Sequence, residues 1–201
     1  MWKKIRKTLT EIKKTSHHHY GPHPSSIIKF LYYSAFRINY FLLFEKNLAE
    51  EIPDISPDPE FQVIIPTMAE LDTLRGEQEL PREFFYDRIH NVKTCFLALH
   101  QGEIAYIHWV YFKGDYSRFL NLTEGSAEIN YATTLPKFRG RNLSGKMFAL
   151  STRYLKDRGI KRVYMLCHVE NPPIIKSFKK AGYREIRRII SIGPFNRRIN
   201  V

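Results

Sequence analysis

The pattern that most constrains the fold is a helix, a buried strand and a second helix in succession near the C-terminal end. Apolar residues recur at helical spacing over 143–154, and Gly159 follows as a typical C-terminal cap. Residues 162–169 are β-branched and apolar, as in a strand that is buried on both faces. A second helix is predicted from Asn171, a good N-cap, to Gly182. Helices that alternate with a buried strand are crossover connections, so the sequence predicts an α/β fold.

The residues before this unit supply further strands. Thr67 and Glu70 have the spacing of a capping box, which predicts a helix directly after a first strand. A glycine-containing turn at 100–102 predicts a hairpin. The expected segments are strands at 61–65, 94–99, 103–112 and 127–134, a helix after Thr67, a helix over 81–90 and a last strand after Gly182. With the C-terminal unit they predict one mixed α+β sheet with two late crossover helices.

The N-terminal part of the chain differs in composition from the rest. Its first residues alternate apolar and basic side chains at helical spacing, which predicts a short basic amphipathic helix. An aromatic-rich stretch from Ser25 is expected to form a helix that runs into a strand near Phe41. The acidic, proline-rich run 52–59 has the composition of a linker. We therefore expect an N-terminal helical extension over 1–60 and a single domain over 61–201.

The net charge of +12 is distributed unevenly. Residues 137–201 hold 17 Lys and Arg against 3 Asp and Glu, whereas residues 61–136 hold 6 against 10. A strongly basic half attracts nucleic acid, anionic membranes and polyphosphate ligands alike, because all three respond to clustered positive charge. Specific nucleic-acid binding is not expected, because the basic residues do not share one face with aromatic side chains.

Three features bear on the compartment. The longest apolar stretch, 27–44, is interrupted by polar residues and is too short to span a bilayer. Residues 1–14 lack a signal-peptide cleavage pattern, so a cytoplasmic location is expected, with peripheral membrane contact through residues 1–44 as an open alternative. Cys95 and Cys167 are expected to be buried thiols, and no spacing of His and Cys predicts a metal site.

A basic, glycine-containing segment at 136–146 joins an expected strand to an expected helix. The free N–H groups of a helix N-terminus and the positive end of its dipole can hold a pyrophosphate. The segment resembles the acetyl-CoA loop of the GCN5-related N-acetyltransferases, whose pattern is Arg or Gln, two residues, Gly, one residue, and Gly or Ala. This pattern falls on Arg139, Asn142 and Ser144, so two of its three fixed positions depart from the family.

A second part of the chain carries the same resemblance. The family places an Asn before the next helix and ends that helix with Gly and an aromatic residue, as in Asn171, Gly182 and Tyr183. The resemblance covers 61–190 and implies an acyl-CoA N-acyltransferase fold that uses acetyl-CoA as acyl donor and no metal. Carried over position by position, it implies that acetyl-CoA contacts Ala132, Thr133, Thr134, Arg139, Gly140, Arg141, Asn142, Leu143, Ser144, Gly145 and Asn171.

The resemblance also implies a reaction. Glu128 precedes Arg139 by eleven positions, as a Glu does in the histone-acetyltransferase branch, and is the candidate general base. A Glu partly buried on a strand would have a raised pKa, as a base requires. The expected reaction is direct attack on acetyl-CoA, in a ternary complex, by a primary amine of a small molecule or protein. The alternative is a degenerate acyl-CoA-binding or peripheral membrane-associated module without catalysis.

Two details of this reaction stay open. Many family members place a Tyr acid where this chain has Phe178, so either water or one of Tyr131, Tyr164 and Tyr183 would serve the leaving thiolate. The acceptor is expected beside residues 76–91, where four acidic side chains would suit a cationic amine and neighbouring aromatic side chains could pack a sugar or apolar group. Ordinary solvated charges and core aromatic residues are the other interpretation of that segment.

Overall fold

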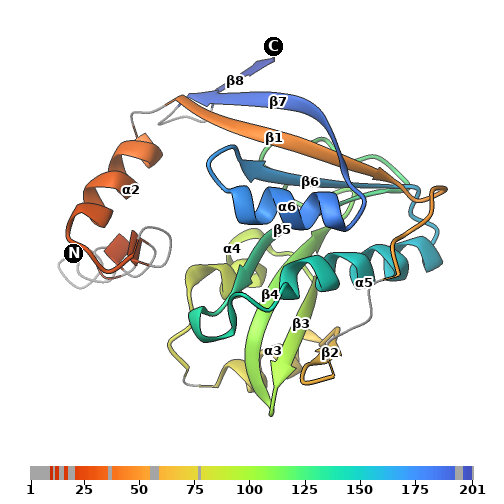
Figure 1. Ribbon diagram of the computed structural model, residues 1–201, viewed down its shortest axis with the longest axis horizontal. Helices are drawn as coiled ribbons and strands as arrows, with labels where there is room; N and C mark the ends of the chain where they lie inside the picture. The colour runs from red at the N-terminus through yellow and green to blue at the C-terminus, as the bar shows by residue number, and fades with distance from the viewer. Residues whose placement is uncertain are drawn as a thin grey trace.

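The computed structural model describes residues 10, 12, 13, 16, 17, 21–35, 38–54, 59–76, 78–192 and 197–200. Over these residues the chain forms an eight-stranded sheet with helices packed against it (Figure 1). The strands are β1 (Ile38–Asn47), β2 (Gln62–Ile64), β3 (Thr94–His100), β4 (Glu103–Tyr111), β5 (Ser126–Thr134), β6 (Arg162–His168), β7 (Arg184–Ile192) and β8 (Arg197–Asn200). The helices are α2 (Ser25–Ala35), α3 (Met68–Arg75), α4 (Tyr86–His90), α5 (Leu143–Asp157) and α6 (Pro172–Lys180), with 3₁₀ turns η1 (Arg82–Phe85) and η2 (Pro136–Phe138). The mixed α/β fold is as predicted.

The sheet opens in its middle. Its strand order is β2, β3, β4, β5, β6, β1, β7, β8, and every neighbouring pair is antiparallel except β5 and β6. The parallel pairing joins 126–129 of β5 to 162–165 of β6 and then stops. Both strands continue without pairing to each other, so their C-terminal ends diverge. Beyond Ile129, β5 stays paired with β4 on one edge, and on its other edge it has no neighbouring strand.

The helices α5 and α6 cover one face of the sheet. Ala127 and Ile129 of β5 form one apolar cluster there with Met147 and Phe148 of α5 and Phe178 of α6, and all five are buried. Crossover helices pack on a sheet in this way because each presents one apolar stripe to it. The two helices thus fix the position of the segment that precedes α5.

The opposite face is covered by α3, η1 and α4. Trp109 and Tyr111 of β4 pack there with Leu71 of α3 and Phe84 of η1. Because both faces are covered, β4 is buried along nearly its whole length, which explains its almost continuous apolar sequence.

The strand β1 comes from the N-terminal part of the chain but lies between β6 and β7 (Figure 1). Phe44 at its centre faces Met165 on one side and Glu185 on the other. The Phe44 ring is fully buried, with its centroid 5.2 Å from that of Phe178. The sequence predicts that the domain begins near Phe61, yet this strand, which precedes Phe61, is an interior strand of the same sheet.

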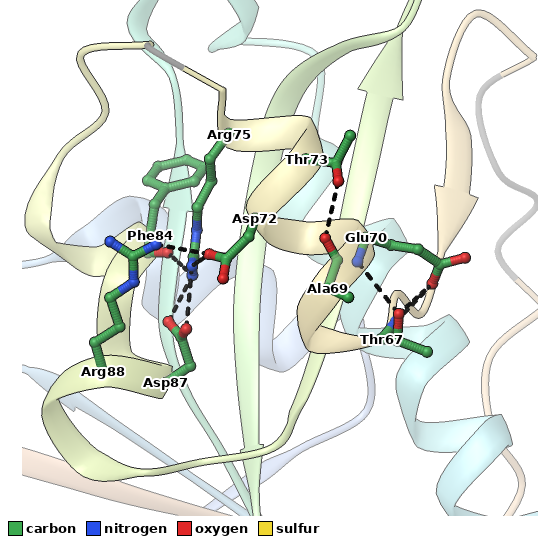
Figure 2. Close-up of polar contacts among 9 residues, drawn as sticks. All are labelled: Thr67, Ala69, Glu70, Asp72, Thr73, Arg75, Phe84, Asp87 and Arg88. Atoms are coloured by element: carbon green, nitrogen blue, oxygen red, sulfur yellow. Dashed lines mark hydrogen bonds and ion pairs between the residues drawn. The ribbon is translucent and has the colours of Figure 1, made fainter.

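Two turn predictions are confirmed in detail. The Thr67 hydroxyl accepts from the Glu70 N–H at 3.2 Å, and the Glu70 carboxylate accepts from the Thr67 N–H at 2.7 Å, which is the predicted capping box (Figure 2). The hairpin between β3 and β4 turns through Gln101 and Gly102 with φ of 52° and 81°. A two-residue turn with both angles positive matches the twist of the paired strands.

The predicted helix over 81–90 is wrong as one element, since it is divided into η1 and α4. The Trp109 indole N–H donates to the Glu83 carbonyl at 2.7 Å, and the Arg75 guanidinium donates to the Phe84 carbonyl. These carbonyls are thereby occupied by side chains of other elements, which compete with the i→i+4 hydrogen bonds of a continuous helix.

The N-terminal predictions are described only in part. The aromatic-rich helix is α2, and it leads to β1 as expected. The basic amphipathic helix falls mostly outside the described residues, of which 10, 12 and 13 are helical. Strand β8 was not predicted. Within the described part of the chain, none of the helices has the length and apolar character of a bilayer span.

Candidate functional site

An open groove of about 790 Å³ lies beside the end of β5. Its walls are that end of β5, the segment before α5, the first turn of α5 and one side of α6. The lining residues are Ala132, Thr133, Thr134, Phe138, Arg139, Gly140, Asn142, Leu143, Ser144, Asn171, Pro173, Ile174, Lys176, Ser177 and Lys180. Three of them are basic and none is acidic, so the groove suits an anionic ligand.

The segment before α5 turns through two left-handed residues, Gly140 with φ of 85° and Asn142 with φ of 54°. Asn is among the few residues other than Gly that adopt this conformation readily. Asn142 therefore takes the backbone conformation for which Gly is best suited, which explains one of the two departures from the family pattern. The Asn142 side-chain amide lies against Gly145 in the first turn of α5. A Cβ atom at position 145 would be only 3.2 Å from Asn142 Oδ1, so a larger residue there would crowd this amide.

The start of α5 is arranged for hydrogen bonding to a ligand. Asn142 makes no side-chain cap bond to α5, so the first N–H groups of this helix are not satisfied by their N-cap side chain. Arg139 Nε donates to the Thr134 carbonyl at 3.3 Å, which holds this cation beside the groove. Lys176 and Lys180 add charge from α6, where they lie one helical turn apart. Together they fit the diphosphate portion of a nucleotide thioester.

Nine of the eleven residues predicted to contact acetyl-CoA line this groove. The two others do not. Arg141 is ion-paired with Glu60 and lies over the Phe61 ring, 5.6 Å from its centroid. Gly145 is buried inside the first turn of α5 and serves the packing of Asn142. Lys176 and Lys180 were missed, although their spacing after Asn171 is a signal that sequence reasoning could have used.

A smaller hollow of about 140 Å³ continues from the groove between the diverging strands. It is lined by residues of β5, β6, α5 and α6, including Asn130, Tyr131, His168, Asn171 and Phe178. The Asn171 side chain caps α6 by accepting from the Ile174 N–H at 3.4 Å. Phe178 is a core residue, packed between Phe44 and Phe148, so no hydroxyl lies where many family members have one. The hollow is therefore lined by an apolar ring at this point.

Glu128 lies on β5, one residue before the strands diverge. It is 1% exposed, and its Oε1 accepts from Asn130 Nδ2 at 2.7 Å. Asn130 Oδ1 in turn accepts from the N–H of Tyr131, whose φ is 55°. Tyr131 belongs to a β-bulge in β5, which lies opposite the register shift between Ile107 and Trp109 of β4. Asn130 thus links the buried carboxylate to the hollow.

A group of aromatic side chains surrounds this point on the face covered by α4. The Tyr131 ring centroid lies 4.0 Å from that of Tyr86, 5.3 Å from that of His90 and 5.9 Å from that of Tyr111. His90 also contacts Tyr116 at 4.8 Å, and its Nδ1 is 3.1 Å from the Tyr111 hydroxyl. Burial, helped by the Arg82 charge, lowers the pKa of His90. Tyr86 and Tyr111 are among the aromatic residues expected beside the acceptor, with Phe84, Phe85 and Trp109, whereas the place of His90 in this group was not predicted.

Of the four acidic residues in segment 76–91, Glu77 lies outside the described residues and Glu79 is exposed. The Asp87 carboxylate receives two hydrogen bonds from Arg75 (Figure 2). Glu83 is buried. Phe84 and Trp109 are completely buried and belong to the core. Their burial favours the interpretation of this segment as ordinary packing and internal ion pairing.

The three candidate acids differ in position. The Tyr183 hydroxyl is buried and 2.6 Å from the Thr152 hydroxyl of α5, so it serves the core, and burial raises its pKa. Tyr164 packs partly buried against the clusters on the α4 face. Tyr131 alone of the three lines the hollow, and burial raises its pKa as well. Over the described residues, no group of three or more His, Cys, Asp or Glu could hold a metal ion.

A mixed sheet that opens beside a basic helix N-terminus defines the acyl-CoA N-acyltransferase fold. The model of the acetyltransferase (GNAT) family matches residues 64–183, and the chain belongs to this family. No curated protein matches the sequence significantly.

Solved structures agree on the fold. A GNAT-family protein from Novosphingobium aromaticivorans has a TM-score of 0.54 and 18% identity, with 77% of this chain and 63% of that one covered. A GCN5-related N-acetyltransferase from Sphaerobacter thermophilus has a TM-score of 0.55 and 13% identity, with 83% of this chain and 55% of that one covered. A GNAT-family acetyltransferase from Colwellia psychrerythraea has a TM-score of 0.57 and 12% identity, with 92% of this chain and 72% of that one covered. The chain thus spans less than two thirds of the first two, and at these identities the likeness concerns the fold alone.

Proposed function

We propose that the protein transfers an acyl group, acetyl in the simplest case, from acyl-CoA to a primary amine by direct attack in a ternary complex. The observation that carries the proposal is the basic groove beside the end of β5, where this strand has no strand partner on the side of β6. A helix N-terminus with Arg139, Lys176 and Lys180 would hold the phosphates. Backbone groups at 132–134 on the edge of β5 that faces away from β4 would hydrogen-bond the extended pantetheine arm, and Asn171 would contact that arm from α6.

The chemistry requires a base more than it requires an acid. In the proposal Glu128, connected through Asn130 to the hollow, accepts the proton of the attacking amine. When bound, acetyl-CoA supplies the thioester, whose thiol has an ordinary pKa near 8.5, so its thiolate leaves without strong help. This agrees with an apolar Phe178 at the usual position of the acid. Tyr131 remains the candidate donor, because it lines the hollow.

Two adjacent lysines give a matched binding test. Lys180 lines the groove, whereas Lys179 lines a separate hollow with Lys46 and Gly182. Isothermal titration of acetyl-CoA should show binding about tenfold weaker for Lys180→Glu and unchanged for Lys179→Glu. Equal weakening of both would reduce the effect to general charge attraction. Absence of binding by the unaltered chain would refute the proposal.

Turnover is tested by release of free CoA in the presence of a panel of amines: an amino sugar, a polyamine and a lysine peptide. Glu128→Gln should lower the rate about 100-fold and leave acetyl-CoA affinity unchanged. An unchanged rate would remove Glu128 from the mechanism. If acetyl-CoA binds tightly and no amine is acylated, the chain is an acyl-CoA-binding module.

A second candidate function, attachment to a membrane surface through residues 1–44, is favoured by α2. This helix exposes Ile28 at 71%, Leu31 at 45% and Tyr32 at 54%, at spacings that place them on one side. Pelleting with anionic vesicles should be lost in the double variant Ile28→Glu, Leu31→Glu. Equal pelleting of variant and parent would contradict membrane attachment through α2. A cytoplasmic location is part of the proposal, since Cys95 and Cys167 are both buried and free.

A further inference from the structure

His168 reaches the hollow from the face of the sheet that lies away from α5 and α6. This residue ends β6 and is paired with Phe41 of β1, so the two side chains lie on the same face. Their neighbours Cys167 and Leu42 belong to the apolar cluster under α5 and α6, and successive side chains of a strand point to opposite faces. His168 lines the hollow between the diverging strands. It does so from the side opposite the basic groove, where an acceptor would have to approach the acyl group.

The His168 ring is fixed in position and in its tautomer. Its Nδ1 accepts a hydrogen bond from the Glu170 N–H at 3.2 Å, and its ring meets the Phe41 ring edge to face with centroids 5.5 Å apart. A ring nitrogen that accepts carries no proton, so a neutral imidazole in this place carries its proton on Nε2. The contact with Glu170 thus holds His168 as a hydrogen-bond donor at Nε2.

A cation contacts the same Phe41 ring. The guanidinium carbon of Arg118 lies 5.1 Å from the Phe41 centroid and 4.7 Å from the Phe119 centroid, and the two rings are 4.9 Å apart. Phe119 is buried in one cluster with Leu166, which lines the hollow next to His168. Arg118 is half-buried. A charge that is partly shielded from water attracts an opposite charge more strongly than one in bulk water does.

The acidic side chains that would suit a cationic acceptor are engaged elsewhere. Asp87 is bound by Arg75, as described above. Glu45, which β1 adds to the face of Phe41, is ion-paired with Arg162 at 3.5 Å. A second cationic group on the acceptor would be repelled by Arg118, whereas an anionic group would gain both this charge and the Nε2–H of His168.

We propose that His168 and Arg118 select an acceptor whose amine stands beside an anionic oxygen group, as in an α-amino acid. The amine of such an acceptor faces the thioester in the hollow, His168 Nε2–H donates to a carboxylate oxygen, and the Arg118 guanidinium supplies the opposite charge. The inference rests on the proposed function and gives its acceptor a chemical class. It differs from the cationic amine that the acidic sequence of residues 76–91 suggests.

The first experiment compares two acceptors that differ only in a carboxylate, L-phenylalanine and phenethylamine, with acetyl-CoA and the full chain. Their aromatic ring is chosen because Phe41 and Phe119 can pack against it. Release of CoA should give a kcat/KM about tenfold higher for phenylalanine, which corresponds to one hydrogen bond to a charged group. Equal values, or a preference for phenethylamine, would overturn the inference and leave the proposed function standing.

Variants separate recognition of the carboxylate from the different basicity of the two amines. Arg118→Leu and His168→Phe should each lower the phenylalanine-to-phenethylamine ratio of kcat/KM about tenfold. His168→Gln retains an N–H donor and should lower the ratio less. Arg162→Leu is the matched control, because this arginine lies on the same face of β6 but is 62% exposed and paired with Glu45. Its ratio should equal that of the unaltered chain, and a ratio unchanged in Arg118→Leu and His168→Phe would overturn the inference.

A measurement without acceptor distinguishes failure of the inference from failure of the proposed function. Nitrogen-15 NMR of the histidine side chains, assigned with His168→Gln, should show the His168 proton on Nε2. A signal from Nδ1–H would overturn the role of His168, whether or not acetyl-CoA binds. If the proton is on Nε2 and acetyl-CoA binds, but neither amine is acylated, the catalytic function is refuted and the acceptor class with it.

Discussion

The guanidinium of Arg75 holds the carboxylate of Asp87 with two hydrogen bonds, of 2.6 Å and 3.1 Å, although the residues belong to different helices (Figure 2). Arg75 closes α3, and only 2% of its side chain is exposed. The Arg75 guanidinium also donates to the Phe84 carbonyl and, from Nη1, to Asp72 Oδ1 at 2.9 Å. The contact fixes α4 against α3 and with it the aromatic group that faces the open end of β5.

Arg75→Gln should lower the free energy of unfolding by about 3 kcal/mol, because it leaves the buried Asp87 carboxylate without its charged partner. Urea denaturation measures the loss. Arg88→Gln is the control, since Arg88 also donates to Asp72 Oδ1, at 2.7 Å, but is 60% exposed. Its loss should be much smaller. Equal losses would mean that the Asp72 pair, and not the Asp87 pair, carries the stability.

The left-handed conformation of Asn142 gives a prediction for the groove. Asn142→Ala should lower stability by about 1 kcal/mol and weaken acetyl-CoA binding, whereas Asn142→Gly should do neither. Asn91 has a similar φ of 57° at the end of α4, outside the groove, and is likewise exposed. Asn91→Ala should therefore lower stability equally and leave acetyl-CoA affinity unchanged. Thermal unfolding and calorimetric titration of the three variants decide this, and a loss of affinity in Asn91→Ala would contradict it.

The buried imidazole of His108 predicts how stability depends on pH. Burial lowers its pKa to about 3, whereas the unfolded chain takes up this proton near pH 6.5. Between these two pH values the unfolded chain binds more protons than the folded chain does. The contribution of neutral His108 to the free energy of unfolding is therefore complete above pH 6.5 and is lost as the pH falls toward 3. His108→Phe should make the fall in unfolding free energy shallower by up to about 1.4 kcal/mol per pH unit in this window. Parallel curves for variant and parent would show that His108 titrates normally.

The place of β1 in the sheet predicts the result of truncation. A chain that begins at residue 61 should fail to show cooperative unfolding, because it lacks the partner of both β6 and β7. A chain that begins at residue 38 should unfold cooperatively. Phe44→Ala in the full chain should cost about 3 kcal/mol, since the ring is fully buried. Circular dichroism during thermal unfolding compares the three, and cooperative unfolding of the shorter chain would contradict the prediction.

Sequence patterns predicted the elements that depend on local signals. The capping box of Thr67 and Glu70 and the glycine turn at 100–102 specify their conformations through residues close in sequence. Asn171 was identifiable for the same reason, as an N-cap before a proline. Of these residues Asn171 lines the groove, and the family resemblance named eight further lining residues on β5 and around the start of α5.

The features that were missed depend on contacts between distant residues. The break between η1 and α4 follows from donors on β4 and α3, and nothing in residues 81–90 announces them. His90 joins the aromatic group only because α4 packs over β5. The periodicity of apolar residues in a strand does not indicate which other strands it pairs with. The position of β1 between β6 and β7 could therefore not be predicted from residues 38–47.

The insertion of β1 also sets the order in which the molecule can be completed. Phe44 is paired with Met165 and Glu185, which follow it by more than 100 residues in the sequence. The strand β1 can therefore enter the sheet only when β6 and β7 are available to pair with it. Contacts between such distant residues slow folding and leave apolar strands exposed in the meantime. Because β6 lines the hollow and pairs with β1, the hollow can form only after residues 38–47 have come together with residues 162–168.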